Sequence, residues 1–271
     1  MGDAVTYPLV ADVSNYDADT FDAECFKAAG IAGVIIGCQR PYAANAMARK
    51  AKDAGLPILG VYAFLYFGID TIGQTGRAID VAHEFDVPMV WLDCESATPH
   101  EAADATTVSR RVELAHCVDM VERDLQCGIY TGRYWWPSKM ATDEFAHLPL
   151  WLADYGRNDG SRAPLLTTNF GGWTKVAIHQ YTSTYDLCGR GRDMNYLLTE
   201  EEDMTPTQAK MLSDVWLACT GGDAAILANF NANPGNSLIA LALATNQRIA
   251  EHEVRPHAGS AHEHEATVRL T

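Results

Sequence analysis

The sequence has few cysteines, and their positions exclude several kinds of site. Seven cysteines are spread over 271 residues, and no two of them form a Cys-x-x-Cys pair. Small disulfide scaffolds have many more cysteines for their length, and structural zinc sites and thiol redox motifs have closely spaced pairs. We therefore expect reduced, mostly buried thiols.

Two further absences narrow the classes of function. The formal net charge is −15, whereas nucleic acids are bound by clustered lysines and arginines, so we expect no nucleic-acid partner. A neutral sugar chain is not excluded. No apolar run approaches the roughly 18 residues that cross a bilayer, and the first 17 residues contain no basic segment followed by an apolar one. We expect no membrane insertion, and synthesis in a cytosol without a secretion signal.

The composition, with 48% hydrophobic and 20% charged residues, is typical of a globular protein with one large core. Short apolar runs alternate with helical patterns through the first half of the chain, which indicates repeated βα units and a parallel sheet. The predicted strands are almost continuously apolar, as strands buried on both faces are. They cover residues 7–13, 33–38, 57–64, 88–95 and 128–131.

Glycines mark the ends of the predicted helices between these strands. Gly30 and Gly55 each follow a helical pattern, and glycine readily adopts the left-handed conformation that caps a helix. The fourth helix has the clearest pattern, because its apolar residues recur at helical spacing. They are Val108, Val112, Ala115, Val118, Val121 and Leu125.

The alternation of predicted strands and helices changes after residue 131. The segments 148–154, 175–181 and 193–197 are typical of strands but have no long helices between them. Five βα units followed by three strands predict an α/β fold, a closed (β/α)5β3 TIM-like barrel, and such barrels carry their active sites at the carboxyl ends of the strands. We assign residues 1–203 to this barrel.

Residues 204–271 are expected to form a small α-helical C-terminal region. Thr205 and Pro206 are typical of a helix start, which predicts one helix over about 206–219 and a second over about 237–253. Two helices of this size bury too little surface to fold alone, so we expect docking or homo-oligomerisation. Histidines in the following tail match no zinc spacing, and we predict a solvated tail, no metal and no cofactor.

The strongest chemical signal is the strand end VWLDCES at 90–96. Asp93 and Glu95 lie on one side of a strand while Cys94 lies on the other, and the two acids are about 6.6 Å apart along the backbone. Acids this close do not titrate independently, so the more enclosed one should keep its proton to higher pH while its partner stays charged. Such a pair serves glycoside cleavage. The alternative is a solvated loop after a strand.

Two more acids lie at strand ends that a closed barrel brings together. Asp12 ends the first predicted strand, and Asp193 begins the last one. First and last strands are neighbours in a closed barrel. We therefore expect Asp12 and Asp193 to converge with Asp93 and Glu95 at one mouth of the barrel.

These residues and their surroundings resemble glycoside hydrolase family 25, the lysozymes or N-acetylmuramidases that are common among bacteriophage endolysins. The resemblance covers residues 7 to about 198 and implies the family's (β/α)5β3 barrel, in agreement with the strand count. The segments that carry it follow the family's order and spacing: DVSNYD at 12–17, AGLPILGVYAF at 54–64, VWLDCE at 90–95, GIYTGRYWW at 128–136, LPLWLADYG at 148–156, and HQYTST followed by DMN at 179–195.

The resemblance implies a role for each acid. Glu95 is the general acid, and Asp93 orients and stabilises the reacting sugar. Asp12 and Asp193 flank the same pocket. The resemblance also implies retention of configuration with help from the substrate's own acetamido group, which Asp93 assists, so that no enzyme nucleophile is modified covalently. Tyr62 matches a family tyrosine whose hydroxyl hydrogen-bonds the substrate.

Further side chains near the strand ends are candidates for binding the sugar chain. Gln180 belongs to the family's Trp-Gln-Tyr triplet, which reads His-Gln-Tyr here. Trp91 precedes Asp93 on the same face and is expected to fill the barrel. Aromatic rings can stack on sugar faces, and the candidates for this role are Phe64, Tyr130, Trp151 and Tyr155.

Three functions are compatible with this sequence. The first is a peptidoglycan muramidase that cleaves the β-1,4 bond between N-acetylmuramic acid and N-acetylglucosamine, as a phage lysin that stays in the host cytoplasm until a holin opens the membrane, or that is carried in the virion. The second is a non-catalytic or weakly active wall-binding component of a phage particle, assembled through residues 204–271. The third is a hydrolase that uses the acid cluster to bind Mg²⁺ or Mn²⁺.

Overall fold

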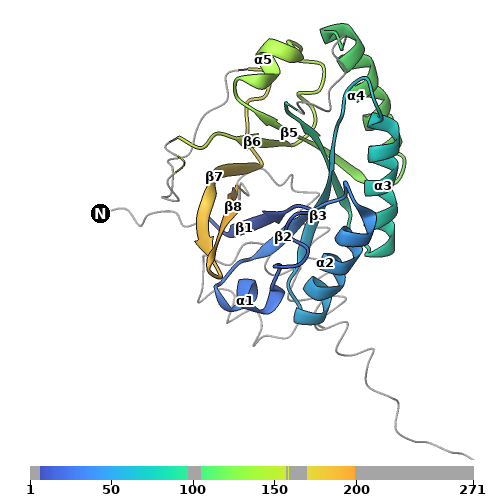
Figure 1. Cartoon of the computed structure of the whole chain (residues 1–271). Coiled ribbons are helices and arrows are strands. Elements are labelled where there is room, and N and C mark those ends of the chain that lie inside the picture. Colours follow the sequence, from blue (N-terminus) through green and yellow to red (C-terminus); the bar gives the residue numbers. More distant parts are fainter. Residues whose placement is uncertain (1–6, 97–104, 157, 159–169, 199–271) are drawn as a thin grey trace, which may run out of the picture. The chain divides into compact units, whose positions relative to one another are not determined.

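The structure is a computed structural model that describes residues 7–96, 105–156, 158 and 170–198. In these residues eight strands close into one barrel (Figure 1), as predicted. The predicted region 204–271, with its two helices, lies outside the described residues. No helix within the described ranges combines the length and the apolar content needed to cross a bilayer.

Strands and helices alternate up to the sixth strand, and in the described residues beyond it the further elements are two strands. In chain order the elements are β1 (Leu9–Val13), α1 (Ala23–Ala28), β2 (Gly33–Gly37), α2 (Pro41–Ala54), β3 (Ile58–Phe64), α3 (Thr71–Glu84), β4 (Met89–Cys94), α4 (Thr107–Val121), β5 (Gln126–Gly132), α5 (Trp135–Lys139), β6 (Leu150–Ala153), β7 (Ile178–Leu187) and β8 (Arg190–Leu197).

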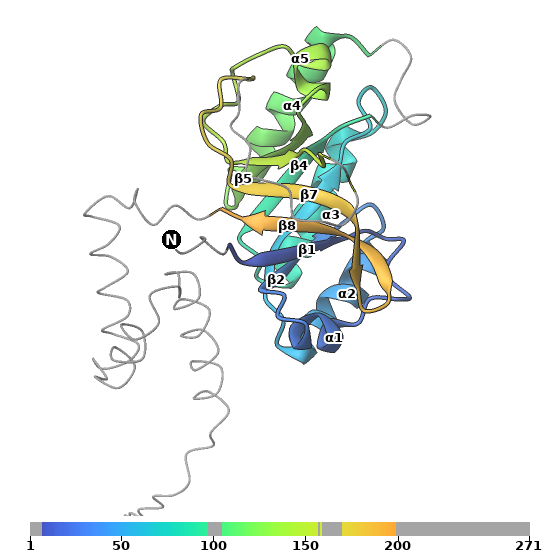
Figure 2. The ribbon, with the colours of Figure 1, turned by 90° about the vertical axis from the view of Figure 1, so that its left-hand side faces the viewer.

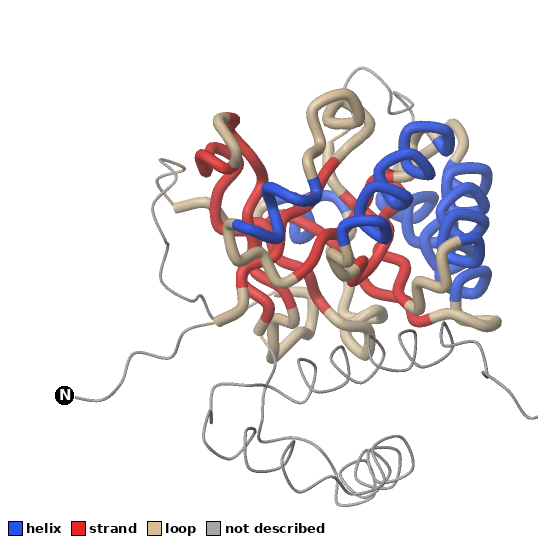
Figure 3. The backbone as a smooth tube through the Cα atoms, turned by 90° about the horizontal axis from the view of Figure 1, so that it is seen from below, coloured by secondary structure: helices blue, strands red, loops and turns tan. Residues whose placement is uncertain are grey.

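The barrel closes through an antiparallel strand. β1 to β7 pair in parallel with their chain neighbours, and β8 runs antiparallel between β7 and β1. Figure 2 shows β7, β8 and β1 side by side, and Figure 3 shows the helices outside the ring of strands. In the β1–β8 register Asp12 lies opposite Asp193. Closure thus places two acids together that are far apart in the chain.

The helices begin and end where local chemistry allows. The alanine-rich α2 has Pro41 in its first turn and ends at Gly55, whose φ of 63° is left-handed, as predicted from the sequence. At the start of α4, the side chains of Thr106 and Ser109 accept hydrogen bonds from each other's backbone N–H groups. Such a capping box satisfies donors that the first helical turn leaves free.

The prediction of which residues form the buried face of α4 is partly wrong. Val118 and Val121 are buried, but Val108 is 68% and Val112 65% exposed. The first turns of the buried face are formed instead by Arg110 and Leu114. An arginine can bury its methylene groups along an apolar surface. Arg110 therefore lies on the buried face of α4, and Val108 and Val112 lie outside it.

The β7–β8 hairpin is longer than predicted. β7 continues to Leu187 rather than ending at 181, and β8 begins at Arg190 rather than 193. The second half of β7 alternates between exposed and more buried residues. A strand with one solvated face carries polar side chains at alternate positions, which is why this part of the sequence lacks the apolar run of a buried strand.

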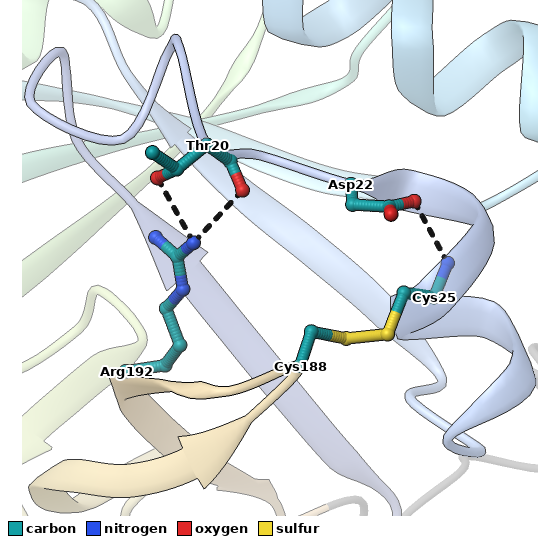
Figure 4. Close-up of a disulfide and its surroundings, with 5 residues drawn as sticks. All are labelled: Thr20, Asp22, Cys25, Cys188 and Arg192. Atoms are coloured by element: carbon teal, nitrogen blue, oxygen red, sulfur yellow. Dashed lines mark hydrogen bonds between the residues drawn. A yellow bond between two sulfur atoms is a disulfide. The ribbon is translucent and has the colours of Figure 1, made fainter.

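The cysteine prediction is wrong for one pair. Cys25 on α1 and Cys188 in the β7–β8 turn form a disulfide across 163 residues of sequence (Figure 4). The described free cysteines are buried, as predicted; they are Cys38, Cys94, Cys117 and Cys127. Sequence spacing does not reveal the pair, because only barrel closure brings α1 beside the hairpin.

The barrel interior is filled by one cluster of side chains, which we call the barrel filling. Trp91 belongs to it, as predicted. The filling consists of Val10, Ile35, Tyr62, Trp91, Tyr130, Trp151 and Ile178. A second, larger core lies between strands and helices and includes Cys94. The two cores confirm that alternate residues of β4 face opposite sides.

Two glycines, Gly60 and Gly128, make room for the side chain of Trp91. We expect Gly128→Ala to lower the free energy of unfolding by about 1–3 kcal/mol, because overpacking a core costs this much. A Cβ at Gly128 would lie 2.4 Å from Cζ3 of Trp91, and one at Gly60 would lie 2.8 Å from its Nε1. The control is Gly76→Ala on α3, where a Cβ meets nothing within 4 Å and where alanine favours the helix. Urea unfolding checks both; equal effects would contradict this packing.

Candidate active site

Four carboxyl groups meet at one end of the barrel. Asp12 and Asp193 lie opposite each other on β1 and β8. Asp93 is near the carboxyl end of β4, and Glu95 directly follows that strand. The charge of Asp12 raises the pKa of each of the other three carboxyl groups. The structure therefore brings the four predicted acids together.

Burial raises the pKa of every member of this cluster. It raises the pKa of Asp12 to about 6, against the effect of hydrogen bonds from Asn195 and Gln180. Burial, followed by the charge of Asp12, raises the pKa of Glu95 to about 7 and that of Asp193 to about 8. Removing a carboxylate from water disfavours its charged form, and nearby like charges add to this effect.

Asp93 is the more enclosed acid of the Asp93–Glu95 pair, because only 5% of its surface is exposed. Burial, with the charges of Glu95 and Asp12, raises its pKa well above the usual range. Both members of the pair therefore hold protons more strongly than ordinary acids, and Asp12 has the lowest pKa of the four. Among the described residues none donates a hydrogen bond to the buried Oδ1 of Asp93, which adds to the cost of charging this group.

Two hydrogen-bonded chains end on Asp12. In the first, the hydroxyl groups of Tyr130 and Tyr155 donate to Oε1 of Gln180 over 2.8 and 2.6 Å, and Nε2 of Gln180 donates to Oδ2 of Asp12 over 2.9 Å. The second chain runs through Asn195, which receives a hydrogen bond from Trp151 and donates to the same Asp12 oxygen over 2.8 Å. The side chains below the acids thus fix the position of Asp12.

Tyr62 and Phe64 extend the site along β3. Tyr62 is buried, and after burial itself the charges of Asp12 and Asp93 are the main influences that raise its pKa. Phe64 is half-buried at the end of β3 and pairs in register with Asp93. Both residues are therefore beside the acids, where the sequence placed them.

The sugar-stacking role predicted for Trp151 does not fit its position. Trp151 is 2% exposed in the barrel filling, and its indole N–H bonds Asn195. Tyr130 is also buried, and its hydroxyl supports Gln180, whereas Tyr155 is half-buried. Layers of side chains fill small barrels, so rings below the strand ends support the site and cannot present a face to a sugar.

Sequence reasoning missed Asn195. It lies two residues beyond Asp193 on β8 and is fully buried, with one N–H on the Val10 carbonyl and one on Asp12. Residues two apart on a strand share a face, so the spacing of Asp193 and Asn195 was the available signal.

A second missed interaction supports the loop after β1. Arg192 pairs with Asp17 and donates to the carbonyl and hydroxyl oxygens of Thr20 over 3.0 and 3.1 Å (Figure 4). The Asp17 carboxylate also accepts hydrogen bonds from the N–H and hydroxyl of Ser14. Together with the Cys25–Cys188 disulfide, these contacts fasten the loop and α1 to the strand that carries Asp193.

Within the described ranges, no three His, Cys, Asp or Glu side chains are grouped so that they could hold a metal ion.

The raised pKa values predict that the protein loses stability as the pH rises. A group whose pKa is higher in the folded state stabilises the fold below its unfolded pKa, and this contribution is lost as the pH rises through the folded pKa. For Asp193 the window runs from its ordinary value of 3.8 to about 8. We expect Asp193→Asn to reduce the loss between pH 5 and pH 8.5 by about 2 kcal/mol, discounted for partial solvent exposure. Urea unfolding at both pH values measures this difference; parallel pH dependence in variant and wild type would contradict it.

Comparison with known proteins assigns most of the barrel to one family. Residues 11–190 match the family model described as glycosyl hydrolases family 25. Among the Dictyostelium discoideum relatives, counting factor 50 is 26% identical over 162 residues, which cover 56% of this chain and 52% of that protein. Probable GH family 25 lysozyme 3 is 25% identical over 166 residues, which cover 59% of this chain and 34% of that protein. The chain therefore spans only about half and a third of these relatives.

Solved structures share the fold. A family 25 glycosyl hydrolase from Bacillus anthracis has a TM-score of 0.59 at 16% identity, and the match covers 73% of this chain and 92% of that one. The modular Cpl-1 endolysin, solved in complex with a peptidoglycan analogue, has a TM-score of 0.53 at 20% identity, covering 75% and 58%. From the match to the family model over most of the barrel, we conclude that the chain belongs to glycosyl hydrolases family 25.

Proposed function

We propose that the protein is a peptidoglycan hydrolase that cleaves the β-1,4 bond between N-acetylmuramic acid and N-acetylglucosamine. The observation that carries the proposal is the four-carboxyl cluster, in which the pKa of Glu95 is raised to about 7. An acid with such a pKa is still about half protonated at neutral pH and releases its proton readily, as a general acid must.

In the proposed reaction Glu95 donates its proton to the glycosidic oxygen as the bond to the anomeric carbon breaks. The acetamido oxygen of the same sugar attacks that carbon, and Asp93 accepts a hydrogen bond from the acetamido N–H. The place of Asp93 beside Glu95 at the carboxyl end of β4 supports this role. Glu95, now a carboxylate, takes a proton from water, which attacks the anomeric carbon and restores the acetamido group. Two displacements at one carbon retain its configuration.

The place and time at which this activity is used stay a prediction. The resemblance to endolysins suggests a phage lysin that a holin releases, or one carried in the virion, and residues 204–271 would then dock or oligomerise. The Cys25–Cys188 disulfide supports action outside a reducing cytosol, since such bonds persist in oxidising surroundings. The bacterial cell wall lies in such surroundings.

Incubation with purified, insoluble peptidoglycan tests the proposal. We expect the turbidity of the suspension to fall and new reducing ends to form at an equal rate with and without EDTA. Loss of activity in EDTA would favour the metal-dependent alternative. Protein that sediments with the peptidoglycan but releases no sugar would instead favour a non-catalytic wall-binding component.

A further inference from the structure

One oxygen of Asp12 accepts both side-chain hydrogen bonds that its carboxylate receives from amides. Nε2 of Gln180 lies 2.9 Å and Nδ2 of Asn195 lies 2.8 Å from Oδ2. All three side chains are buried, and Asp12 is 6% exposed. Because both bonds are made away from bulk water, each should affect Asp12 more than a surface hydrogen bond would.

The orientation of both amides is determined by groups behind them. Oε1 of Gln180 accepts from the hydroxyl groups of Tyr130 and Tyr155. Oδ1 of Asn195 accepts from the indole N–H of Trp151 over 2.7 Å, and its amide also donates to the Val10 carbonyl. Indole nitrogen is only a donor, so flipping the Asn195 amide would place its NH2 group against the indole N–H of Trp151. Each amide therefore presents its N–H, and not its oxygen, to Asp12.

Two N–H groups on one carboxylate oxygen favour the charged form, because each hydrogen bond is stronger to a charged oxygen than to the oxygen of a neutral carboxyl group. We propose that Gln180 and Asn195 are positioning residues that keep Asp12 ionised, and that this charge in turn keeps the proton on Glu95. The second half of this inference rests on the proposed function of Glu95, whereas the first half does not.

The surroundings of Asp12 show why the amides matter. The ionisable groups that act with it come from four strands and two loops: Asp17 after β1, Tyr62 on β3, Asp93 and Glu95 at β4, Tyr130 on β5, Tyr155 after β6 and Asp193 on β8. All of these are acids. Of the influences on the pKa of Asp12, only hydrogen bonds lower it, led by those of Asn195 and Gln180.

The charge of Asp12 is a major influence on its neighbours. After burial, it is the remaining cause of the raised pKa of Glu95 and the next largest cause for Asp193. Neutralising Asp12 should therefore let Glu95 lose its proton at lower pH. The two amides, which do not touch Glu95 in this arrangement, thus act on the general acid through Asp12.

The pH profile of kcat/KM on peptidoglycan separates this role from a merely structural one. In Gln180→Met the acid limb, which reports ionisation of Asp12, should move up by about one pH unit. The alkaline limb, which reports Glu95, should not move down in this variant, because Asp12 is ionised there in both proteins. It should move down in Asp12→Asn, which removes the charge at every pH. A lower profile of unchanged width would overturn the inference. The matched control is Gln74→Met on α3, a buried glutamine whose Oε1 accepts from the Tyr66 backbone N–H; its profile should keep the wild-type limbs.

A titration that needs no activity tests the first half directly. In protein carrying ¹³C-labelled aspartate carboxyl groups, the Asp12 signal is the one missing in Asp12→Asn. In Gln180→Met the pH at the midpoint of this signal should rise by about one pH unit, which is a tenfold increase in the proton affinity of Asp12. If that variant does not fold, Tyr155→Phe removes one donor to Gln180 and should raise the midpoint in the same direction by less. An unchanged midpoint in the folded variant overturns the role of the amides. A raised midpoint in a protein without peptidoglycan hydrolysis would leave that role intact and remove the proposed function.

Discussion

Replacing Glu95 with glutamine should lower kcat for peptidoglycan hydrolysis about 10³-fold, within the range that general acids contribute. The amide keeps the size of the side chain but cannot give a proton to the leaving oxygen. Because Asp12, Asp93 and Asp193 remain, substrate binding should change little, and Glu95→Gln should still sediment with insoluble peptidoglycan.

The matched control for this variant is Glu24→Gln. Glu24 is exposed in the first turn of α1, so the same chemical change there should leave kcat within twofold of wild type. Circular dichroism and thermal unfolding establish that both variants fold. A folded Glu95→Gln protein with wild-type kcat would show that another group supplies the proton.

Removing the Cys25–Cys188 disulfide should lower the free energy of unfolding by about 4 kcal/mol, because cross-linking so long a loop restricts the unfolded chain. The bond joins residues 163 positions apart, and it ties α1 to the hairpin that carries Asp193. The double variant Cys25→Ser/Cys188→Ser should therefore unfold at a temperature lower by roughly 10 °C.

A reducing agent provides the internal control for this prediction. It should lower the melting temperature of the wild type toward that of the double variant and leave the double variant unchanged, since its remaining described cysteines are free and buried. If the reducing agent does not change the melting temperature of the wild type, the disulfide does not stabilise the fold. Activity at low temperature should survive, because the bond joins α1 to the β7–β8 turn, whereas the four acids lie on β1 and β8 and at the end of β4.

The barrel was predictable because its parallel strands are buried on both faces. Continuous apolar runs mark β1 to β5, and glycines such as Gly55 mark where helices end. The same logic fails where a face is solvated: the polar second half of β7 carries no apolar run, so its extent was missed. The face of α4 was misjudged because Arg110 is buried while Val108 is exposed, a choice that depends on tertiary packing.

The acids of the site were predictable because Asp12, Asp93 and Glu95 lie at the carboxyl ends of β1 and β4, and closure of the barrel places β8, with Asp193, beside β1. Their supporting residues were not. Trp151 and Tyr130 are aromatic residues near strand ends, but whether a ring faces a sugar or lies in the layer below depends on its depth in the barrel. For Asn195 the spacing from Asp193 indicates a shared face, but its role follows from its contacts with Asp12 and Trp151.

The disulfide illustrates a limit of the same kind. Cys25 and Cys188 lie in segments without any shared motif, and their spacing gives no reason to pair them. The contact exists because α1 packs beside the last hairpin, next to the Arg192–Asp17 ion pair. Pairings of this sort follow from the closed topology and not from local pattern.

Mass spectrometry of the fragments released from peptidoglycan identifies the bond that the protein cleaves. After borohydride reduction, we expect fragments that end in reduced N-acetylmuramic acid, since the bond on the reducing side of that sugar is the one cleaved. Fragments that end in reduced N-acetylglucosamine, or cleavage within the peptide alone, would contradict the proposed muramidase reaction.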